Sequence, residues 1–256
     1  MPDLLTTVAL CAAAALAGWV DAVSGGGGLI QLPALLVALP GAGPAAVLAT
    51  NKLSSVCGTA VATATYYRRV RPDLRTALPM VGAAVLGSAG GAACATLIPT
   101  SAFRPLVLVL LVLVGLYTFR RPDLGADQAL RFSGQRHYTA AVLAAAGIGF
   151  YDGIFGPGTG SFLTFALVGL LGYSFLQASA KARMVNLGTN VGALVVFFSH
   201  GAPMVRLGLT MGACNVAGGW LGAHTAITRG SRFVRLVFLT VVGGLVLRIA
   251  YDVVVP

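Results

Sequence analysis

Long apolar segments, separated by short polar or glycine-rich interruptions, make up most of the chain. Five precede a polar stretch at 120–137 and five follow it. About 20 apolar residues cross the hydrocarbon core of a bilayer as a helix. The second segment of each group, at ~1.5 Å per residue, is too short to cross as a plain helix, so we expect it to be broken or re-entrant. The ten segments are 4–22, 28–39, 45–66, 75–98, 103–119, 138–154, 160–171, 178–199, 205–227 and 233–253.

The two groups of segments repeat each other at a constant offset of 131 residues. Asp21 corresponds in this way to Asp152, and Arg104 to Arg235. Matches among alanine, leucine and glycine are common by chance in such a composition, but matching charged residues in one register are not. Similarity at a fixed offset between two sets of membrane segments is typical of transporters built from internal repeats.

The charges of equivalent loops predict opposite orientations for the two repeats. Loop 68–75 is rich in arginine while its counterpart 199–206 holds one, and loop 228–235 is rich while its counterpart 97–104 holds one. Because arginine-rich loops favour the cytoplasm, we expect them inside together with 120–137, and both termini outside. We therefore expect an all-α polytopic membrane protein of two inverted five-helix repeats, with an N-terminal repeat at 1–119, a cytoplasmic linker at 120–137 and a C-terminal repeat at 138–256.

The composition agrees with a membrane protein. Hydrophobic residues make up 57% of the 256 residues and charged residues 9%, against roughly 25% in soluble domains. So few charges exclude a soluble enzyme, a disordered chain and a coiled coil. The net charge of +10 comes from arginines in short loops, which is a membrane-orienting pattern rather than a nucleic-acid surface. The four cysteines lie apart in apolar segments, so we expect packing residues and no metal site.

Each repeat carries an aspartate followed by a glycine-rich break. Glycines let the backbone leave the helix and expose N–H groups in a concave nest that suits an anion. Non-helical backbone at membrane depth needs cover from protein or a watery cavity. One interpretation is a substrate site made from interrupted helices, and the other is a tight loop at the membrane surface. The substrate-binding candidates in the breaks are Gly25, Gly26, Gly27, Gly156 and Gly158.

The two aspartates, Asp21 and Asp152, allow two roles. An aspartate in hydrocarbon costs about 3 kcal/mol on insertion scales, so each needs a partner or a function. Each could carry a coupled proton. Alternatively, each caps its break by accepting hydrogen bonds from freed backbone N–H groups.

The third segment of each repeat begins with a cation followed by hydrogen-bonding residues on one helix face. The functional interpretation is a paired cationic site for a small anion. The alternative is a cation that snorkels near a helix end, with polar residues that hold helices together. The substrate-binding candidates are Asn51, Lys52, Ser55 and Thr59 in the first repeat and Arg183, Asn186 and Asn190 in the second.

Other motifs predict packing rather than chemistry. Gly87 and Gly91, like Gly218 and Gly222, have the spacing of closely packed membrane helices. We expect His137 in the central loop. No Ser/His/Asp, HExxH or CxxC arrangement is present, so we expect no enzyme activity and no cofactor.

The stretches GWVDAVSGGGGLIQLPALL and ATNKLSSVCGTA, with DGIFGPGTGSFL and KARMVNLGTN in the second repeat, resemble the sulfite exporter TauE/SafE family, also called the toluene sulfonate uptake permease family. The resemblance implies a multi-pass carrier in the cell (inner) membrane for small sulfur-containing anions such as sulfite, thiosulfate or organosulfonates.

The family resemblance and the internal repeat together predict transport by alternating access. The expected partners are the anion and the lipid bilayer, with no nucleic acid. Protons are a further partner if the aspartates carry them rather than cap the breaks. An anion channel, or a carrier of another small anion, is the alternative function. The sequence leaves the oligomeric state, the coupling ion and the direction of transport open.

Overall fold

The computed structural model describes residues 2–96, 130–200 and 203–254. Every regular element within these ranges is helical, as expected. The expected segment 103–119 lies outside the described residues. The helices are α1 (Leu4–Ser24), α2 (Gly28–Ala38), α3 (Pro44–Val70), α4 (Leu74–Ala95), α6 (Gly134–Ile154), α7 (Thr159–Phe165), the π-helical turn η1 (Ala166–Leu170), α8 (Phe175–Ser199) and α9 (Val205–Val254).

Local sequence explains where several helices begin. Asp3 precedes α1 and accepts a hydrogen bond from the Thr6 N–H at 3.3 Å, while Asp73 precedes α4 and accepts from the Thr76 N–H at 3.3 Å. Burial opposes the charge of Asp73, but this bond, that of the Thr76 hydroxyl and the nearby Lys181 outweigh it and lower the pKa of Asp73.

Among the described residues, three helices are long and apolar enough to cross a membrane, namely α1, α4 and α8. The apolar helices that follow the two glycine-rich breaks are shorter, at Gly28–Ala38 and Thr159–Leu170. With 11 residues, α2 is roughly 16 Å long, about half of the hydrocarbon core. The two short helices thus begin where the sequence predicts interruptions.

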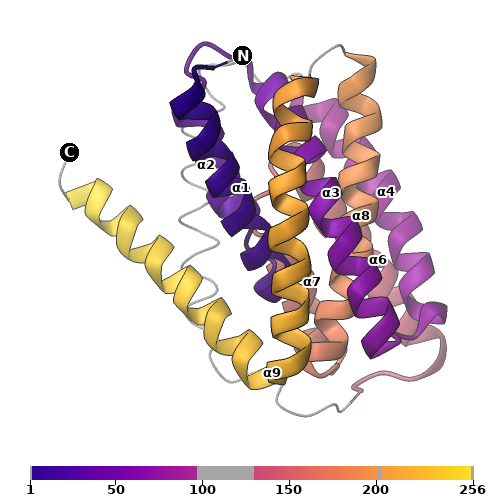
Figure 1. Ribbon diagram of the computed structural model, residues 1–256. Helices are drawn as coiled ribbons and strands as arrows, with labels where there is room; N and C mark the ends of the chain where they lie inside the picture. The colour runs from indigo at the N-terminus through magenta and orange to yellow at the C-terminus, as the bar shows by residue number, and fades with distance from the viewer. Residues whose placement is uncertain (1, 97–129, 201–202, 255–256) are drawn as a thin grey trace.

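The last helix is divided at one residue rather than by a loop. Gly230 has φ 72° and ψ −171°, a conformation that favours glycine, and α9 kinks there. The first part of α9 packs in the bundle beside α1 and α3, whereas the second part leaves the bundle at an angle (Figure 1). The two expected segments at 205–227 and 233–253 are therefore both helical.

Close helix packing at the paired glycines is confirmed. The first part of α9 packs against α1, and α4 packs against α6. Side chains at these glycines would collide with backbone carbonyls of the facing helix, because the helices lie so close. The close approaches are Gly218 to Ala15, Gly222 to Trp19, Gly87 to Ala146 and Gly91 to Phe150. The 131-residue offset relates Ala15 to Ala146 and Trp19 to Phe150, so the two pairs of contacts are equivalent.

Helices α3 and α8 run antiparallel through the centre. At one end, the Gln177 side chain of α8 donates to the carbonyl of Val70 at 3.4 Å. At the other, the Met204 N–H after α8 donates to the hydroxyl of Thr50 at 3.1 Å. Each helix therefore begins where the other ends.

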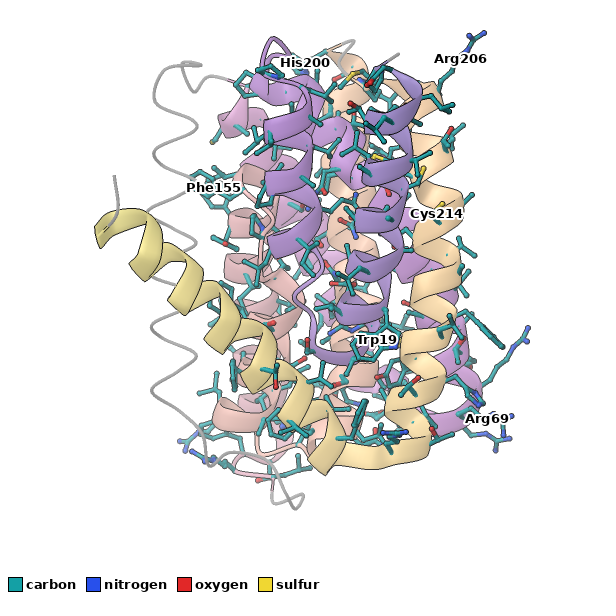
Figure 2. All side chains as sticks on the ribbon, turned by 60° about the vertical axis from the view of Figure 1, so that its left-hand side comes forward. Trp19, Arg69, Phe155, His200, Arg206 and Cys214 are labelled. Carbon is teal, nitrogen blue, oxygen red and sulfur yellow. The ribbon has the colours of Figure 1, made fainter. Side chains whose placement is uncertain are left out.

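The turn between α3 and α4 and the start of α6 lie at one end of the bundle. Arg69 projects at that end, and Arg206 and His200 lie at the opposite end (Figure 2). The sequence placed His137 in a loop, which is wrong, because α6 already begins at Gly134. His137 is buried there and its Nε2 lies 2.9 Å from the hydroxyl of Tyr173.

Candidate functional site

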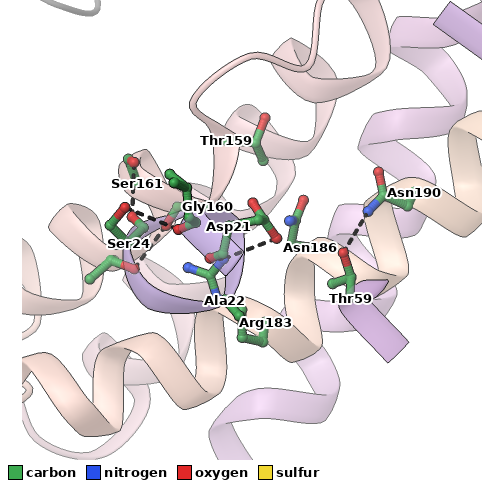
Figure 3. Close-up of polar contacts among 12 residues, drawn as sticks. Asp21, Ala22, Ser24, Thr59, Thr159, Gly160, Ser161, Arg183, Asn186 and Asn190 are labelled. Carbon is green, nitrogen blue, oxygen red and sulfur yellow. Dashed lines mark hydrogen bonds and ion pairs between the residues drawn. The ribbon is translucent and has the colours of Figure 1, made fainter. Parts of the chain in front are cut away.

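The glycine-rich breaks of the two repeats meet in the middle of the molecule. The Gly25 carbonyl accepts a hydrogen bond from the Ser161 N–H at 3.2 Å, and the Ser24 carbonyl accepts from the Ser161 hydroxyl at 2.9 Å (Figure 3). Gly25 and its counterpart Gly156 both have left-handed backbone, with φ 88° and 89°. A side chain at Gly25 would also collide with the backbone of Gly160. Only glycine allows this crossing of two chains.

Two ion pairs connect the repeats at this crossing. The Lys52 ammonium on α3 pairs with the carboxylate of Asp152 on α6. The Arg183 guanidinium on α8 lies 3.2 Å from the carboxylate of Asp21 on α1 (Figure 3). Each cation therefore pairs with the aspartate of the other repeat, and one pair maps onto the other at the 131-residue offset.

These charges are inside the protein. The side chain of Lys52 is 2% exposed and that of Arg183 is 0% exposed, so neither cation snorkels to water. The Asp152 side chain is 2% exposed, while that of Asp21 is 18% exposed. Removing ions from water is costly unless they are paired and hydrogen-bonded, which the two carboxylates provide.

Within the described residues, the two carboxylates contact the two cations and one hydroxyl. Asp152 accepts a second hydrogen bond from the Thr159 hydroxyl, at 2.6 Å. The carbonyl of Asp21 accepts from the Gly25 N–H at 2.8 Å and from Nη1 of Arg183, the same atom that pairs with the Asp21 carboxylate.

Arg183 is left with unused hydrogen-bond donors. Its Nε and Nη2 are buried and have no hydrogen-bond partner within the described part of the chain. An arginine presents these two donors side by side, in a geometry that matches two oxygens of one oxyanion. Buried donors without partners are rare in proteins, and they mark this edge of Arg183 as a candidate anion contact.

A small cavity lies between the two ion pairs. Its volume is about 20 Å³, enough for a single water molecule. A larger anion has no room here until the ion pairs open. The cavity is lined by Asp21, Gly25, Gly28, Asn51, Lys52, Ser55, Asp152, Gly156, Thr159, Gly160, Asn186 and Asn190.

Most of the candidates from the sequence meet around this cavity, although their roles remain predictions. Thr59 does not line the cavity, but it accepts a hydrogen bond at 3.5 Å from the side chain of Asn190, which does (Figure 3). These two residues are counterparts at the 131-residue offset. The candidates that do not line the cavity are Gly26, Gly27, Thr59, Gly158 and Arg183.

Three lining residues and a supporting contact were not predicted from the sequence. Gly28, Thr159 and Gly160 line the cavity, and the hydroxyl of Thr159 within the second break was a visible signal. Gln31 lies buried and donates to the carbonyl of Asn51 at 3.3 Å, while Asn215 donates to Gln31 at 2.8 Å. The signal in the sequence was an isolated amide side chain in each of two apolar segments, because polar residues inside a membrane usually have a partner.

Comparison with known proteins identifies the family of this chain. The family model described as "Sulfite exporter TauE/SafE" matches residues 10–249. The chain belongs to the sulfite exporter TauE/SafE family. No solved structure matches the chain.

Several relatives cover nearly all of this TauE/SafE chain. "Probable membrane transporter protein ORF9" of Sinorhizobium sp is 36% identical over 244 residues, which are 95% of this chain and 92% of the relative. "Probable membrane transporter protein YfcA" of Escherichia coli (strain K12) is 33% identical over 93% of this chain and 87% of its own length. A "Probable membrane transporter protein" of Haemophilus influenzae is 34% identical over 92% and 91%.

These names describe membrane transporters rather than enzymes. Together with the apolar helices, they identify this TauE/SafE chain as a membrane protein of a transporter family.

Proposed function

We propose that this TauE/SafE protein is a multi-pass secondary carrier in the cell (inner) membrane. Its substrates are small sulfur-containing anions such as sulfite, thiosulfate or organosulfonates. The observation that carries the proposal is the buried pair of cations, Lys52 and Arg183, beside glycine-rich backbone and unused Arg183 donors. Charge-assisted hydrogen bonds from such groups are the strong contacts available to an oxyanion leaving water. Sulfur as the central atom rests on the family's description.

The protein works, in this proposal, as two inverted repeats of five helices. Two observations support this arrangement. Contacts between the repeats recur in pairs at the 131-residue offset, as in the two ion pairs and the glycine contacts. In addition, the equivalent helices α3 and α8 run antiparallel and meet at the equivalent residues Thr59 and Asn190. Rocking one repeat against the other then exposes the central site alternately to the two sides.

The small cavity favours a carrier over a channel. A channel needs a continuous path, whereas here the space between the two ion pairs is only about 20 Å³. The anion can enter only when the structure around Lys52 and Arg183 rearranges, which limits transport to one binding event per cycle.

Transport by purified protein in liposomes tests the proposal. Labelled thiosulfate uptake should saturate, and unlabelled thiosulfate trapped inside should accelerate it by counterflow, because a carrier returns loaded faster than empty. Sulfite and methanesulfonate should compete, while chloride in equal excess should not. Uptake that never saturates and shows no counterflow would establish the channel instead. Competition by phosphate or nitrate alone, without the sulfur anions, would overturn the substrate class.

A further inference from the structure

We propose that the carrier moves its anion together with protons, and that the protons bind to Asp152 and Asp21. The number of protons equals the charge of the anion, with a maximum of two. This inference rests on the proposed function and deepens it, because it names the coupled ion and the residues that take it.

The first argument is the balance of charge around the cavity. Two cations face two carboxylates, so the closed site is neutral without an anion. An anion added to this buried site would leave it with a net negative charge, which is costly at low dielectric. One proton on one aspartate restores neutrality for a monoanion. Two protons, one on each aspartate, restore it for a dianion.

The second argument is competition for the same donors. Lys52 contacts Asp152, and Nη1 of Arg183 contacts Asp21, so an oxyanion that binds Lys52 or Nη1 of Arg183 must displace a carboxylate. The size of the cavity also requires an ion pair to open, because about 20 Å³ is too small for a sulfur oxyanion. A displaced carboxylate that is buried without a cation is unstable when charged, and it takes up a proton.

The exchange of one ion pair for a bound anion conserves protons and charge. The ion pair between Lys52 and Asp152 opens, and the anion oxygen accepts the hydrogen bond of the Lys52 ammonium. The Asp152 carboxylate takes one proton from a hydronium ion of the bulk solution, which becomes water. Lys52 keeps its charge and no covalent bond to carbon or sulfur changes. Release on the other side reverses each step, so anion and proton leave together.

The groups around each aspartate fit this role. Within the described residues, Asp152 is faced by Lys52 on α3 and Thr159 on α7, with Tyr151 beside it in the chain. Tyr151 donates its hydroxyl proton to the carbonyl of Pro157 at 2.6 Å and so stays out of the exchange.

Asp21 is faced by Arg183 on α8, and the neighbouring Tyr66 on α3 donates to the carbonyl of Ala22 at 3.0 Å. The two aspartates also line the same cavity. Arginine keeps its proton in proteins, so the carboxylates are the groups that exchange protons here.

Proton uptake during anion binding tests the inference on the purified wild-type protein. Thiosulfate serves as the dianion and methanesulfonate as the monoanion, because both keep their charge across neutral pH. Calorimetric titrations in two amine buffers of different ionisation enthalpy count the protons taken up, and sulfonate buffers are avoided because they are candidate ligands. We expect about one proton per methanesulfonate and about two per thiosulfate. By linkage, each rise of one pH unit should lower the affinity for methanesulfonate about tenfold and that for thiosulfate about a hundredfold.

Variants assign the protons to residues. In D152N and in D21N, thiosulfate binding should take up one proton fewer, and its affinity should depend less steeply on pH. D3N is the matched control, because Asp3 is an exposed residue that caps the start of α1, at the opposite end from Asp21, and asparagine also caps. It should keep the wild-type proton count.

T159V probes a positioning residue. Valine has the same shape but cannot donate to the Asp152 carboxylate, so Asp152 should protonate more readily and binding should persist to higher pH. T164V is its control, because Thr164 donates to the carbonyl of Gly160 and does not contact Asp152.

The outcomes separate the two proposals. Binding of both anions without proton uptake and with pH-independent affinity would overturn the coupling while leaving the anion carrier in place. One proton for both anions would overturn the role of the second ion pair. If neither anion binds the folded wild-type protein, the proposed function fails and this inference fails with it.

Discussion

At the scale of single residues, the two ion pairs place two cations and two carboxylates around the site without a net charge. Lys52 and Arg183 occupy equivalent positions, yet they are not chemically alike. Lysine offers a compact charge with rotatable donors, whereas arginine offers a flat fork that can contact two oxygens at once. Arg183 uses Nη1 on Asp21 and leaves Nε and Nη2 unused, so the two half-sites contribute differently to a bound anion.

Replacing either cation should weaken anion binding. In K52A or R183A, thiosulfate affinity should fall roughly tenfold to a hundredfold, as for loss of a hydrogen bond to a charged group of ~1.5–3 kcal/mol. R183K should lose less than R183A but not be neutral, because lysine cannot make the paired contact. Isothermal titration on folded, monodisperse protein measures these affinities.

The control for this series is R71Q, which removes a charge in the loop after α3 and should leave affinity unchanged. Unchanged affinity in both alanine variants would move the binding site away from these helices. Since each alanine variant also leaves a buried aspartate unpaired, thermal unfolding must first establish that the protein is folded.

At the scale of elements, two short interrupted helices bring the site together. The breaks before α2 and α7 lie against each other, so that Ser161 donates to the backbone at Gly25. This contact places the two aspartates, each close to the end of its long helix, against cations on α3 and α8. Unbroken helices would keep the backbone groups of these segments within their own hydrogen bonds.

The close approach at Gly25 gives a prediction for this element. G25A should destabilise the protein by at least ~1–2 kcal/mol, because alanine disfavours left-handed backbone and its methyl group collides with Gly160. G41A is the matched control, since Gly41 has open space around it and should tolerate the change. Thermal unfolding in detergent compares the two. Equal stability of both variants would show that the breaks do not need this contact.

At the scale of the whole molecule, the arginine-bearing ends indicate how the bundle lies in the membrane. The loop after α3 carries arginines at one end of the bundle, while Arg206 stands at the other (Figure 2). Since positive loops favour the cytoplasm, the end that carries Arg69 should face inside.

Cysteine labelling checks this orientation in a background without native thiols. A membrane-impermeant maleimide added outside should not reach P72C or Q128C in intact cells, and should label both after the membrane is opened. G41C, in the turn between α2 and α3, should be labelled from outside. Labelling of P72C or Q128C from outside would contradict the inverted arrangement.

The sequence by itself determined most of the helices and the composition of the site. Apolar length and glycine-rich breaks act locally, so the segments, the interruptions at 25–28 and 156–158, and the packing glycines could be read from the chain. His137 was misplaced, because its burial against Tyr173 comes from a distant segment.

Only the tertiary structure decided how the charges pair. The 131-residue repeat is satisfied equally if each aspartate pairs with the cation of its own half, Asp21 with Lys52, or with that of the other half. The packing of α4 against both α6 and α8, and of α3 against α8, brings Lys52 on α3 to Asp152 on α6, 100 residues away in the chain. The physical reason is that helix formation depends on neighbouring residues, whereas pairing in the interior depends on which helices the breaks allow to come together.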